Sequence, residues 1–250
     1  MNEWLDDLRT AVAFLTRLPM PHPTGPMPKN FVRAHRLFPV VGAAIGGAVG
    51  LFCLALRAIG LPDLAAAALA LGAGALLTGA LHEDGLADVA DGFGGGRDPA
   101  AKLEIMRDSR LGTYGALMLL VIFVAKVSAL AVLPDAFVVY GLIAAHALAR
   151  GVLPFMSMNL AYARKDGLAA NAGRPDFATA ATAAALALII AWLVLPWREA
   201  FCAALAAAAG AAGMAWLAQR QIDGQTGDVL GGAEQLGETA ILLLLAATLA

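Results

Sequence analysis

Residues 111–133 read LGTYGALMLLVIFVAKVSALAVL, an apolar run in which Lys126 is the single charged residue. A helix needs about 20 mostly apolar residues to cross the hydrocarbon core of a bilayer, so this stretch predicts a transmembrane helix. Similar stretches occur at 37–56, 64–81, 136–160, 177–197 and 199–218, with a shorter one at 237–250. We therefore predict an all-α, polytopic transmembrane helical bundle of about seven spans.

The composition supports this class. The chain of 250 residues is 60% hydrophobic and 14% charged, whereas an ordinary soluble domain is about 45–50% apolar and about 25% charged. Residues 4–18 are amphipathic and are followed by Pro19, which predicts an N-terminal interfacial helix with a stripe of Leu5, Leu8, Val12, Phe14 and Leu15. We expect residues 1–250 to form one integral-membrane catalytic domain.

The partners expected from composition are few. The net charge of −2 and the lack of a basic arm argue against nucleic acid, so the lipid bilayer is the expected surroundings. Cys53 and Cys202 both lie inside predicted spans and are expected to be packing residues. The sequence leaves the oligomeric state open, a homo-oligomer included.

The distribution of Lys and Arg predicts the orientation. Alternating the spans assigns residues 1–36, 82–110, 161–176 and 219–236 to one side, with thirteen basic residues, against two on the other side, Arg57 and Arg198. Short loops rich in Lys and Arg face the cytoplasm. We therefore expect the long loops, and any chemistry on them, to face the cytoplasm from the bacterial inner membrane.

One segment gathers acidic residues. Glu83, Asp84, Asp88 and Asp91 lie within nine residues, and the three aspartates follow the spacing i, i+4, i+7 that places them on one helix face. Like charges on one face repel each other, and a divalent cation with oxygen ligands would offset that repulsion. The alternative is a set of solvated anions near a helix N-terminus. We predict that this segment is the active site and binds metal through Asp84, Asp88 and Asp91.

Two neighbouring segments could hold phosphate. Gly92–Gly96 predicts a turn whose backbone N–H groups, including those of Gly94 and Gly95, could surround a phosphate, or else a flexible hinge. Arg107 and Arg110 have the planar fork that suits phosphate oxygens, and Asp108 between them could bind metal or act as a base. The alternative for this second segment is a surface helix with ion pairs.

Charged residues farther along the chain extend the prediction. Asp228, Glu234 and Glu238 precede the last predicted span and form a second acidic set on the same side. Arg150 lies inside a span, where an ionisable residue usually faces the bundle interior, so it is expected to meet a substrate anion or a carboxylate. Lys126 is expected to serve either a structural pair or the function.

The chain resembles the cobalamin synthase (adenosylcobinamide-GDP ribazoletransferase) family over nearly its whole length and in order. The segments that carry the resemblance are Phe14–Pro19, Phe38–Gly42, His82–Gly96, Ile105–Gly115, Arg150, Tyr162–Leu168 and Thr226–Gly231. Glu83 replaces a Leu common in the family, so it is not counted as a ligand.

The resemblance implies an integral membrane enzyme that joins α-ribazole, or its 5′-phosphate, to adenosylcobinamide-GDP in the late step of cobalamin biosynthesis, with GMP as the second product. It also implies a requirement for Mg²⁺, held by Asp84, Asp88, Asp91 and Asp228. Asp108 or Asp91 would accept the proton of the attacking hydroxyl. The arginines implied to hold phosphate are Arg107, Arg110, Arg150 and Arg164.

Two other functions are considered. A CDP-alcohol phosphotransferase of lipid synthesis uses a comparable acidic helix, but its pattern places Arg after Ala, and here Ala87 is followed by Asp88. A cation-coupled transporter would place its charges near the midplane and often shows inverted repeats, whereas these acidic residues lie at one surface and the sequence shows no repeat.

Overall fold

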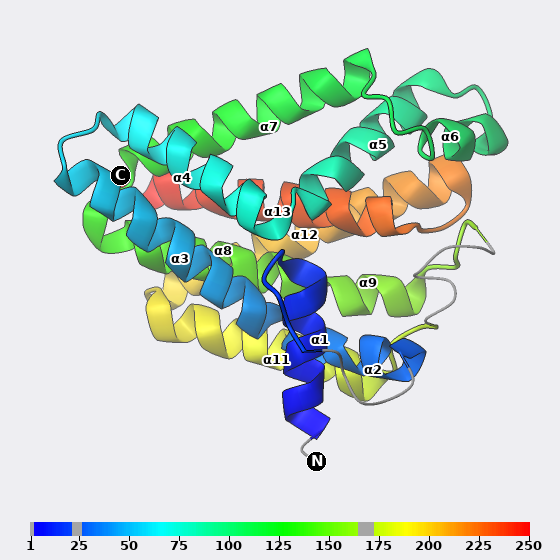
Figure 1. Cartoon of the computed structure of the whole chain (residues 1–250), viewed down its shortest axis with the longest axis horizontal. Coiled ribbons are helices and arrows are strands. Elements are labelled where there is room, and N and C mark those ends of the chain that lie inside the picture. The colour runs from blue at the N-terminus through cyan, green and yellow to red at the C-terminus, as the bar shows by residue number, and fades with distance from the viewer. Residues whose placement is uncertain (1–2, 22–26, 165–172) are drawn as a thin grey trace.

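The computed structural model describes residues 3–21, 27–164 and 173–250, and in that part the chain is helical (Figure 1). Among these residues no β-strand forms, and Tyr162 and Gln225 make an isolated bridge. The helices are α1 (Glu3–Leu15), α2 (Met27–Ala34), the 3₁₀ helix η1 (His35–Leu37), α3 (Phe38–Ala58), α4 (Asp63–Thr78), α5 (Leu81–Gly95), α6 (Pro99–Ile105), α7 (Thr113–Val132), α8 (Asp135–Gly151), α9 (Leu153–Asn159), α11 (Phe177–Val194), α12 (Trp197–Ile222) and α13 (Gly227–Leu249).

The number of spans agrees with the prediction. Six helices of the described part are long and apolar enough to cross a membrane, and α4 with α5 gives up to a seventh as a pair bent by 92°. The polytopic helical bundle is therefore confirmed. One boundary is wrong: the loop predicted for 219–236 is mostly helix, because α12 continues to Ile222 and α13 already begins at Gly227.

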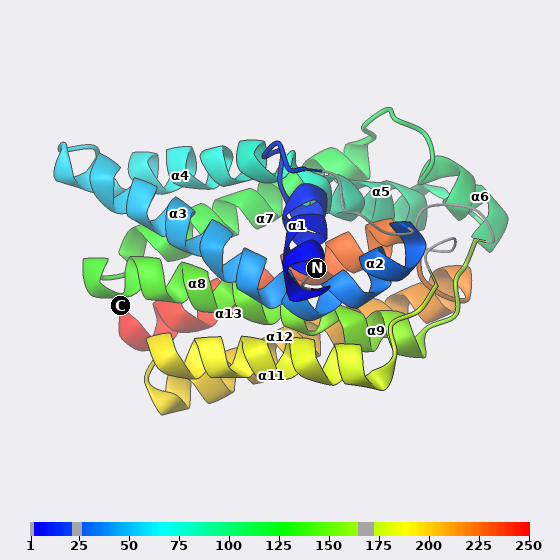
Figure 2. The same cartoon turned by 60° about the horizontal axis from the view of Figure 1, so that its bottom comes forward.

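The connections gather at the two ends of the bundle (Figures 1 and 2). The α3–α4, α7–α8 and α11–α12 turns lie at one end together with the C-terminus, and α5, α6 and the start of α13 lie at the other. This division matches the two sets of loops that the sequence separates. At the first end Arg57 ties two turns together, since its Nη1 lies 2.7 Å from Asp135 and its Nε 3.1 Å from Asp63.

The outer helices present apolar side chains outward. Leu117 and Val121 on α7, Leu193 on α11 and Leu205 on α12 are all more than half exposed. In water such a surface would be unfavourable, whereas against lipid it needs no partner. The bundle is therefore built to be surrounded by the bilayer.

Glycines allow α3 to lie directly against α8. Gly42, Gly46 and Gly50 recur every fourth residue and face the α8 backbone. A Cβ atom on Gly50 would come 2.7 Å from the Cα of Val139, and one on Gly46 would overlap the carbonyl group of Leu142. Small residues at this spacing are how membrane helices reach close van der Waals packing.

A sharp bend turns the chain from α4 into α5. Gly79 and Ala80 both have positive φ, 68° and 54°, which ends α4 and starts α5 in a new direction. The Arg17 backbone N–H donates to the carbonyl of Leu77 at 2.8 Å, so the segment after α1 holds the bend. The acidic helix α5 is thus set at a steep angle to the span that precedes it.

Helix α1 crosses the long helices (Figure 1). Of its predicted stripe, Leu15 is fully buried and Leu8, Val12 and Phe14 pack against the core, whereas Leu5 is 43% exposed. Asp7 is also fully buried, and its carboxylate lies 2.9 Å from Arg33 and 2.7 Å from Arg36, so ion pairs add to apolar contact on the inward side. The interfacial location of α1 stays a prediction.

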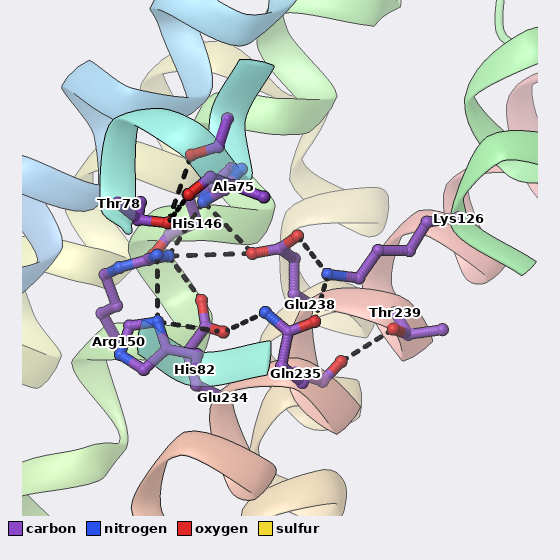
Figure 3. A network of polar contacts seen from close by, with 11 residues as sticks. Ala75, Thr78, His82, Lys126, His146, Arg150, Glu234, Gln235, Glu238 and Thr239 are labelled. Carbon is purple, nitrogen blue, oxygen red and sulfur yellow. Dashed lines mark hydrogen bonds and ion pairs between the residues drawn. The ribbon is translucent and has the colours of Figure 1, made fainter. Parts of the chain in front are cut away.

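A buried ion-pair network joins four helices in the middle of the bundle (Figure 3). Arg150 on α8 lies 2.5 Å from Glu234 on α13, and Lys126 on α7 lies 2.6 Å from Glu238 on α13. All four side chains are at most 5% exposed. Two cations thus balance two carboxylates where a single unpaired ion would be very costly.

Two histidines and an amide complete this network. His82 on α5 lies 3.4 Å from Glu234, and His146 on α8 lies 3.1 Å from Glu238. Gln235 accepts a hydrogen bond from Lys126 and donates one to Glu234 (Figure 3). The sequence placed Glu234 in a cytoplasmic loop and Glu238 just before the last span, which is wrong: both face the bundle interior.

We predict that Gly46→Ala destabilises the bundle. The added methyl group would meet the α8 backbone, and overpacking of this kind costs about 1–3 kcal/mol. The measurement is thermal unfolding in detergent. Gly72→Ala on α4 is the matched control, because nothing lies within 4 Å of its added Cβ. Equal melting temperatures for the two variants would contradict the close α3–α8 packing.

We also predict that Lys126→Met lowers stability by about 3–5 kcal/mol, because it leaves Glu238 buried without its nearest cation. The double variant Lys126→Met with Glu238→Gln removes both charges and should recover much of that loss. Chemical unfolding of the purified protein in detergent compares the two. A double variant less stable than the single one would show that Glu238 does not need Lys126.

Candidate active site

The acidic face of α5 forms as the spacing predicts. Asp84 is exposed, while Asp88 and Asp91 are half-buried on the same helix. The small residues Gly85, Ala87 and Ala90 lie between the aspartates and let another helix come close to the α5 backbone. A Cβ atom on Gly85 would come 2.9 Å from the backbone oxygen of Asp228, so the start of α13 rests directly on α5.

The start of α13 adds a fourth aspartate to this face. Thr226 caps the helix by accepting a hydrogen bond from the N–H of Val229, and its hydroxyl donates to Asp228 at 3.1 Å. Gly231, one turn later, packs against the backbone of His82. The two helices therefore cross at the acidic residues, and the predicted convergence of Asp228 with the α5 aspartates is found.

The charges at this crossing are unbalanced. Asp88 lies within electrostatic range of Asp84, Asp91 and Asp228, which repel it, and of Arg164, which attracts it. Arg164 lies 3.8 Å from Asp228 and also donates to the carbonyl of Leu103. Among the described residues, Arg164 is the cation whose field Asp88 shares with three other carboxylates, an arrangement that favours a bound cation.

Backbone pairing places Arg164 at the site. The N–H of Ala163 donates to the carbonyl of Gln225, and the N–H of Gln225 donates to the carbonyl of Ala161. The Gln225 side chain bonds the carbonyls of Ser157 and Leu160. The segment after α9 is thereby fastened to the turn before α13. The rest of the predicted 162–168 motif, residues 165–168, lies outside the described residues.

Asp91 has a further contact that the sequence does not reveal. Its carboxylate accepts hydrogen bonds from the backbone N–H groups of Gly112, at 2.7 Å, and Gly115, at 2.8 Å. Both groups belong to the start of α7, whose N–H groups otherwise lack helical partners. Asp91 therefore anchors α7 to the acidic helix, and its roles in metal binding and catalysis stay predictions.

The segment between α6 and α7 holds an exposed ion pair. Arg110 donates from Nε to Asp108 at 3.0 Å and lies 2.5 Å from it through Nη2. The side-chain and backbone hydrogen bonds from Arg110 lower the pKa of Asp108. A carboxyl group with a lowered pKa is a weaker base. Arg107 is exposed on the same segment.

The glycines after the acidic residues form a helix end instead of a loop. Gly94 and Gly95 close the last turn of α5, and only Gly96 of the 92–96 segment has extended backbone. A Cβ atom on Gly94 would lie 2.7 Å from the ring of Tyr114. The turn predicted at residues 92–96 is therefore wrong, because residues 92–95 belong to the helix. Glycine at position 94 leaves room for the ring of Tyr114.

Arg150 lies away from the acidic face, in the buried network. Its nearest partner is Glu234, which is the carboxylate alternative that the sequence left open. Arg150 and Lys126 also line a cavity of about 430 Å³ between α4 and α7. None of its lining residues lines a second cavity of the structure, which opens beside Asp84 and Asp228.

A cavity of about 220 Å³ opens beside the acidic residues. Asp84 and Asp228 line one part, and Phe14, Phe31 and Phe38 line another. The sequence does not mark these aromatic residues as a site. Phe31 and Phe38 share a helix face by their spacing, but the pocket forms only when this face meets Phe14 of α1 and the acidic end of α5.

The donor set suits a hard cation. In the described part of the chain, no three side chains of the acidic site bring His, Cys or carboxylate ligand atoms within 4.8 Å of one another, whereas His146, Glu234 and Glu238 do. That buried group already has Lys126 and Arg150 as its cations. Mg²⁺ commonly binds through one or two carboxylates with water and substrate phosphates, so the spread aspartates fit it.

Comparison with known proteins covers nearly the whole chain. The family described as cobalamin-5-phosphate synthase matches residues 7–246. A relative named adenosylcobinamide-GDP ribazoletransferase from Bradyrhizobium diazoefficiens is 46% identical over 243 residues, which cover 96% of this chain and 93% of the relative. No solved structure matches.

Other relatives carry the same name. The protein from Sinorhizobium sp. is 41% identical over 259 residues, covering 99% of this chain and 98% of the relative. The protein from Mesorhizobium japonicum is 42% identical, covering 96% and 92%. The family match and these identities, together with a helical bundle that brings the motif residues of α5 and α13 together, show that the chain belongs to the cobalamin-5-phosphate synthase family.

Proposed function

We propose that the chain is a membrane adenosylcobinamide-GDP ribazoletransferase, a single catalytic domain that makes adenosylcobalamin or its 5′-phosphate in the late step of cobalamin biosynthesis. The observation that carries the proposal is the crossing of α5 and α13, which brings Asp84, Asp88 and Asp228 to Arg164 beside a cavity. The relatives that match over nearly the full length bear this name. The family is neither of the two alternatives considered from the sequence.

The reaction is a displacement at phosphorus. A ribose hydroxyl oxygen of α-ribazole, or of its 5′-phosphate, forms a bond to the phosphorus attached to cobinamide. Because the 5′-phosphate is kept in the product when it is present, the attacking hydroxyl is not the one at the 5′ position. The bond from that phosphorus to the GMP oxygen breaks, and GMP departs with the electron pair. The hydroxyl proton passes to a carboxylate of the site.

Two carboxylates are proposed as the proton acceptor, Asp91 and Asp108. The pairing with Arg110 lowers the pKa of Asp108, and Asp91 accepts two backbone hydrogen bonds, so both carboxylates stay candidates. Arg164 is proposed to hold a phosphate oxygen next to Asp228, with Arg107 and Arg110 contributing from the exposed segment after α6. Arg150 is proposed to act from the buried network through His82, which precedes Asp84 on α5.

Mg²⁺ is the proposed cofactor. Asp84, Asp88 and Asp228 would hold it, with Asp91 beside them. When bound, it supplies positive charge for the diphosphate oxygens as the GMP bond breaks. The excess of carboxylates over cations at the α5–α13 crossing supports this proposal.

The proposed location is the bacterial inner membrane, with the acidic site facing the cytoplasm. The loops at the acidic end carry most of the Lys and Arg outside the spans, which supports this orientation. The substrate nucleotides and Mg²⁺ are then on the same side as the site.

We predict that Asp84→Asn, Asp88→Asn and Asp228→Asn each lower kcat roughly 100-fold or more, because each removes a charge that stabilises the transition state through the metal. The assay uses protein purified in detergent with adenosylcobinamide-GDP, α-ribazole and Mg²⁺, and detects GMP and the cobalamin product. Activity should vanish in EDTA and return when Mg²⁺ is added.

Asp223→Asn is the matched control for these variants. Asp223 is an exposed carboxylate at the same end of the bundle, and its positive φ of 56° is tolerated by Asn. It should keep wild-type activity. Near-normal turnover in two of the three test variants, at equal amounts of folded protein, would falsify the proposed metal site.

Topology reporters test the orientation. A cytoplasmic reporter fused after residue 98 should be active, and a periplasmic reporter fused after residue 61 should be active, because the basic loops stay in the cytoplasm. Reporter activity is normalised to the amount of fusion protein. The reverse pattern would place the acidic residues on the periplasmic side and contradict the proposed location.

A further inference from the structure

An aromatic cluster lies at the meeting of α1, α2 and α3. The rings of Phe14 and Phe31 pack edge to face with centroids 4.8 Å apart, and Phe14 stacks on Phe38 at 5.7 Å. His35 stacks on Phe38 at 4.4 Å, and its Nδ1 is hydrogen-bonded to the carbonyl of Phe31. We call Phe14, Phe31, His35 and Phe38 the aromatic cluster.

The aromatic cluster lines the cavity of about 220 Å³ that Asp84 and Asp228 also line. The cavity therefore has an apolar, aromatic part and a charged part. Helix α2 lies in the same half of the molecule as α5 and the start of α13 (Figure 2). Pockets with apolar walls and a few polar groups at one side are typical small-molecule sites.

We propose that this cavity binds the incoming nucleoside, with the apolar aromatic base of α-ribazole against the aromatic cluster and the attacking ribose hydroxyl toward Asp84 and Asp228. The proposal rests on the proposed function for the identity of the nucleoside. It assigns a substrate site to residues of α1, α2 and α3, which lie outside the acidic helices.

The chemistry of the cluster favours this base over guanine, the other base in the reaction. The methylated benzimidazole base of α-ribazole has an apolar edge that needs no hydrogen bonds. Guanine has an edge of donors and acceptors, and burying it against phenylalanine rings would leave those groups unpaired. Two of the polar side chains that line the cavity are already engaged: Tyr162 donates to Gly173, and His82 meets Glu234 and Arg150.

The size of the cavity favours the same occupant. Pockets for drug-sized ligands are about 300–1,000 Å³, so a space of about 220 Å³ suits a base with part of its sugar. It is too small for a corrinoid ring. With the base held at the phenylalanines, the rest of the nucleoside extends to the aspartates, where the attacking hydroxyl is required.

The first test uses the wild-type protein purified in detergent and equilibrium dialysis without the second substrate. α-Ribazole should bind, its analogue without the two methyl groups should bind more weakly, and guanosine should not compete at the same concentration. Guanosine competing as well as α-ribazole would overturn the proposal, and so would undetectable binding of α-ribazole. This measurement does not depend on turnover, so it remains informative if the transferase assay fails.

The second test compares Phe14→Leu and Phe31→Leu with Phe52→Leu. Loss of one base–ring stack should raise the Kd and the KM for α-ribazole about tenfold while the KM for adenosylcobinamide-GDP stays unchanged. Phe52 is the control because it is an exposed ring on α3 outside the aromatic cluster. It should behave as wild type.

The outcomes separate the two proposals. A KM change confined to α-ribazole in the Phe14 and Phe31 variants supports the nucleoside site. A change confined to adenosylcobinamide-GDP, or no change in either KM, overturns it while leaving the transferase function intact. If a variant unfolds, as shown by its melting curve, the analogue series on the wild-type protein decides. Wild-type protein that binds α-ribazole but forms no GMP would refute only the proposed function.

Discussion

Charge inside an apolar bundle must be paired, and the rest of this structure depends on how the pairing is made. Lys126 and Arg150 reach Glu238 and Glu234 across three helices, and His82 joins them from a fourth. In the bilayer no water is available to solvate a displaced ion, so these helices cannot shift without a large cost. His82 lies two residues before Asp84, and Glu234 lies six residues after Asp228. The network therefore sets the relative positions of the two helices that carry the acidic residues.

Close helix packing supplies the second constraint. In lipid, apolar burial does not drive helices together, so contact area and polar pairs must do so. Gly42 and Gly46 let α3 approach α8, and Gly85 and Gly231 let α13 rest on α5. Glycines thus serve stability at the α3–α8 crossing and bring Asp228 to the α5 aspartates at the α5–α13 crossing. Larger side chains at Gly85 would separate the carboxylates that the proposed metal needs together.

The site could be predicted where its residues share one helix. Asp84, Asp88 and Asp91 are related by helical spacing alone, and the interleaved small residues indicated a close neighbour. The anchoring of α7 by Asp91 could not be predicted, because it joins residues 21 and 24 positions apart through backbone N–H groups. The aromatic cluster was missed for a related reason: Phe31, His35 and Phe38 share one helix face, but only tertiary packing brings Phe14 and the acidic residues to that face.

By itself, the sequence determined the membrane class, the approximate spans, the division of the loops and the acidic face of α5. These properties depend on composition and on periodicity within one segment, which local physics sets. Only the tertiary structure decided that Glu234 and Glu238 lie inside the bundle, that Asp7 is buried and that Gly94 and Gly95 are helical. Each of these depends on a partner distant in sequence. A charged residue is stable in water or in a buried pair, and the sequence does not show which until the partner is in place.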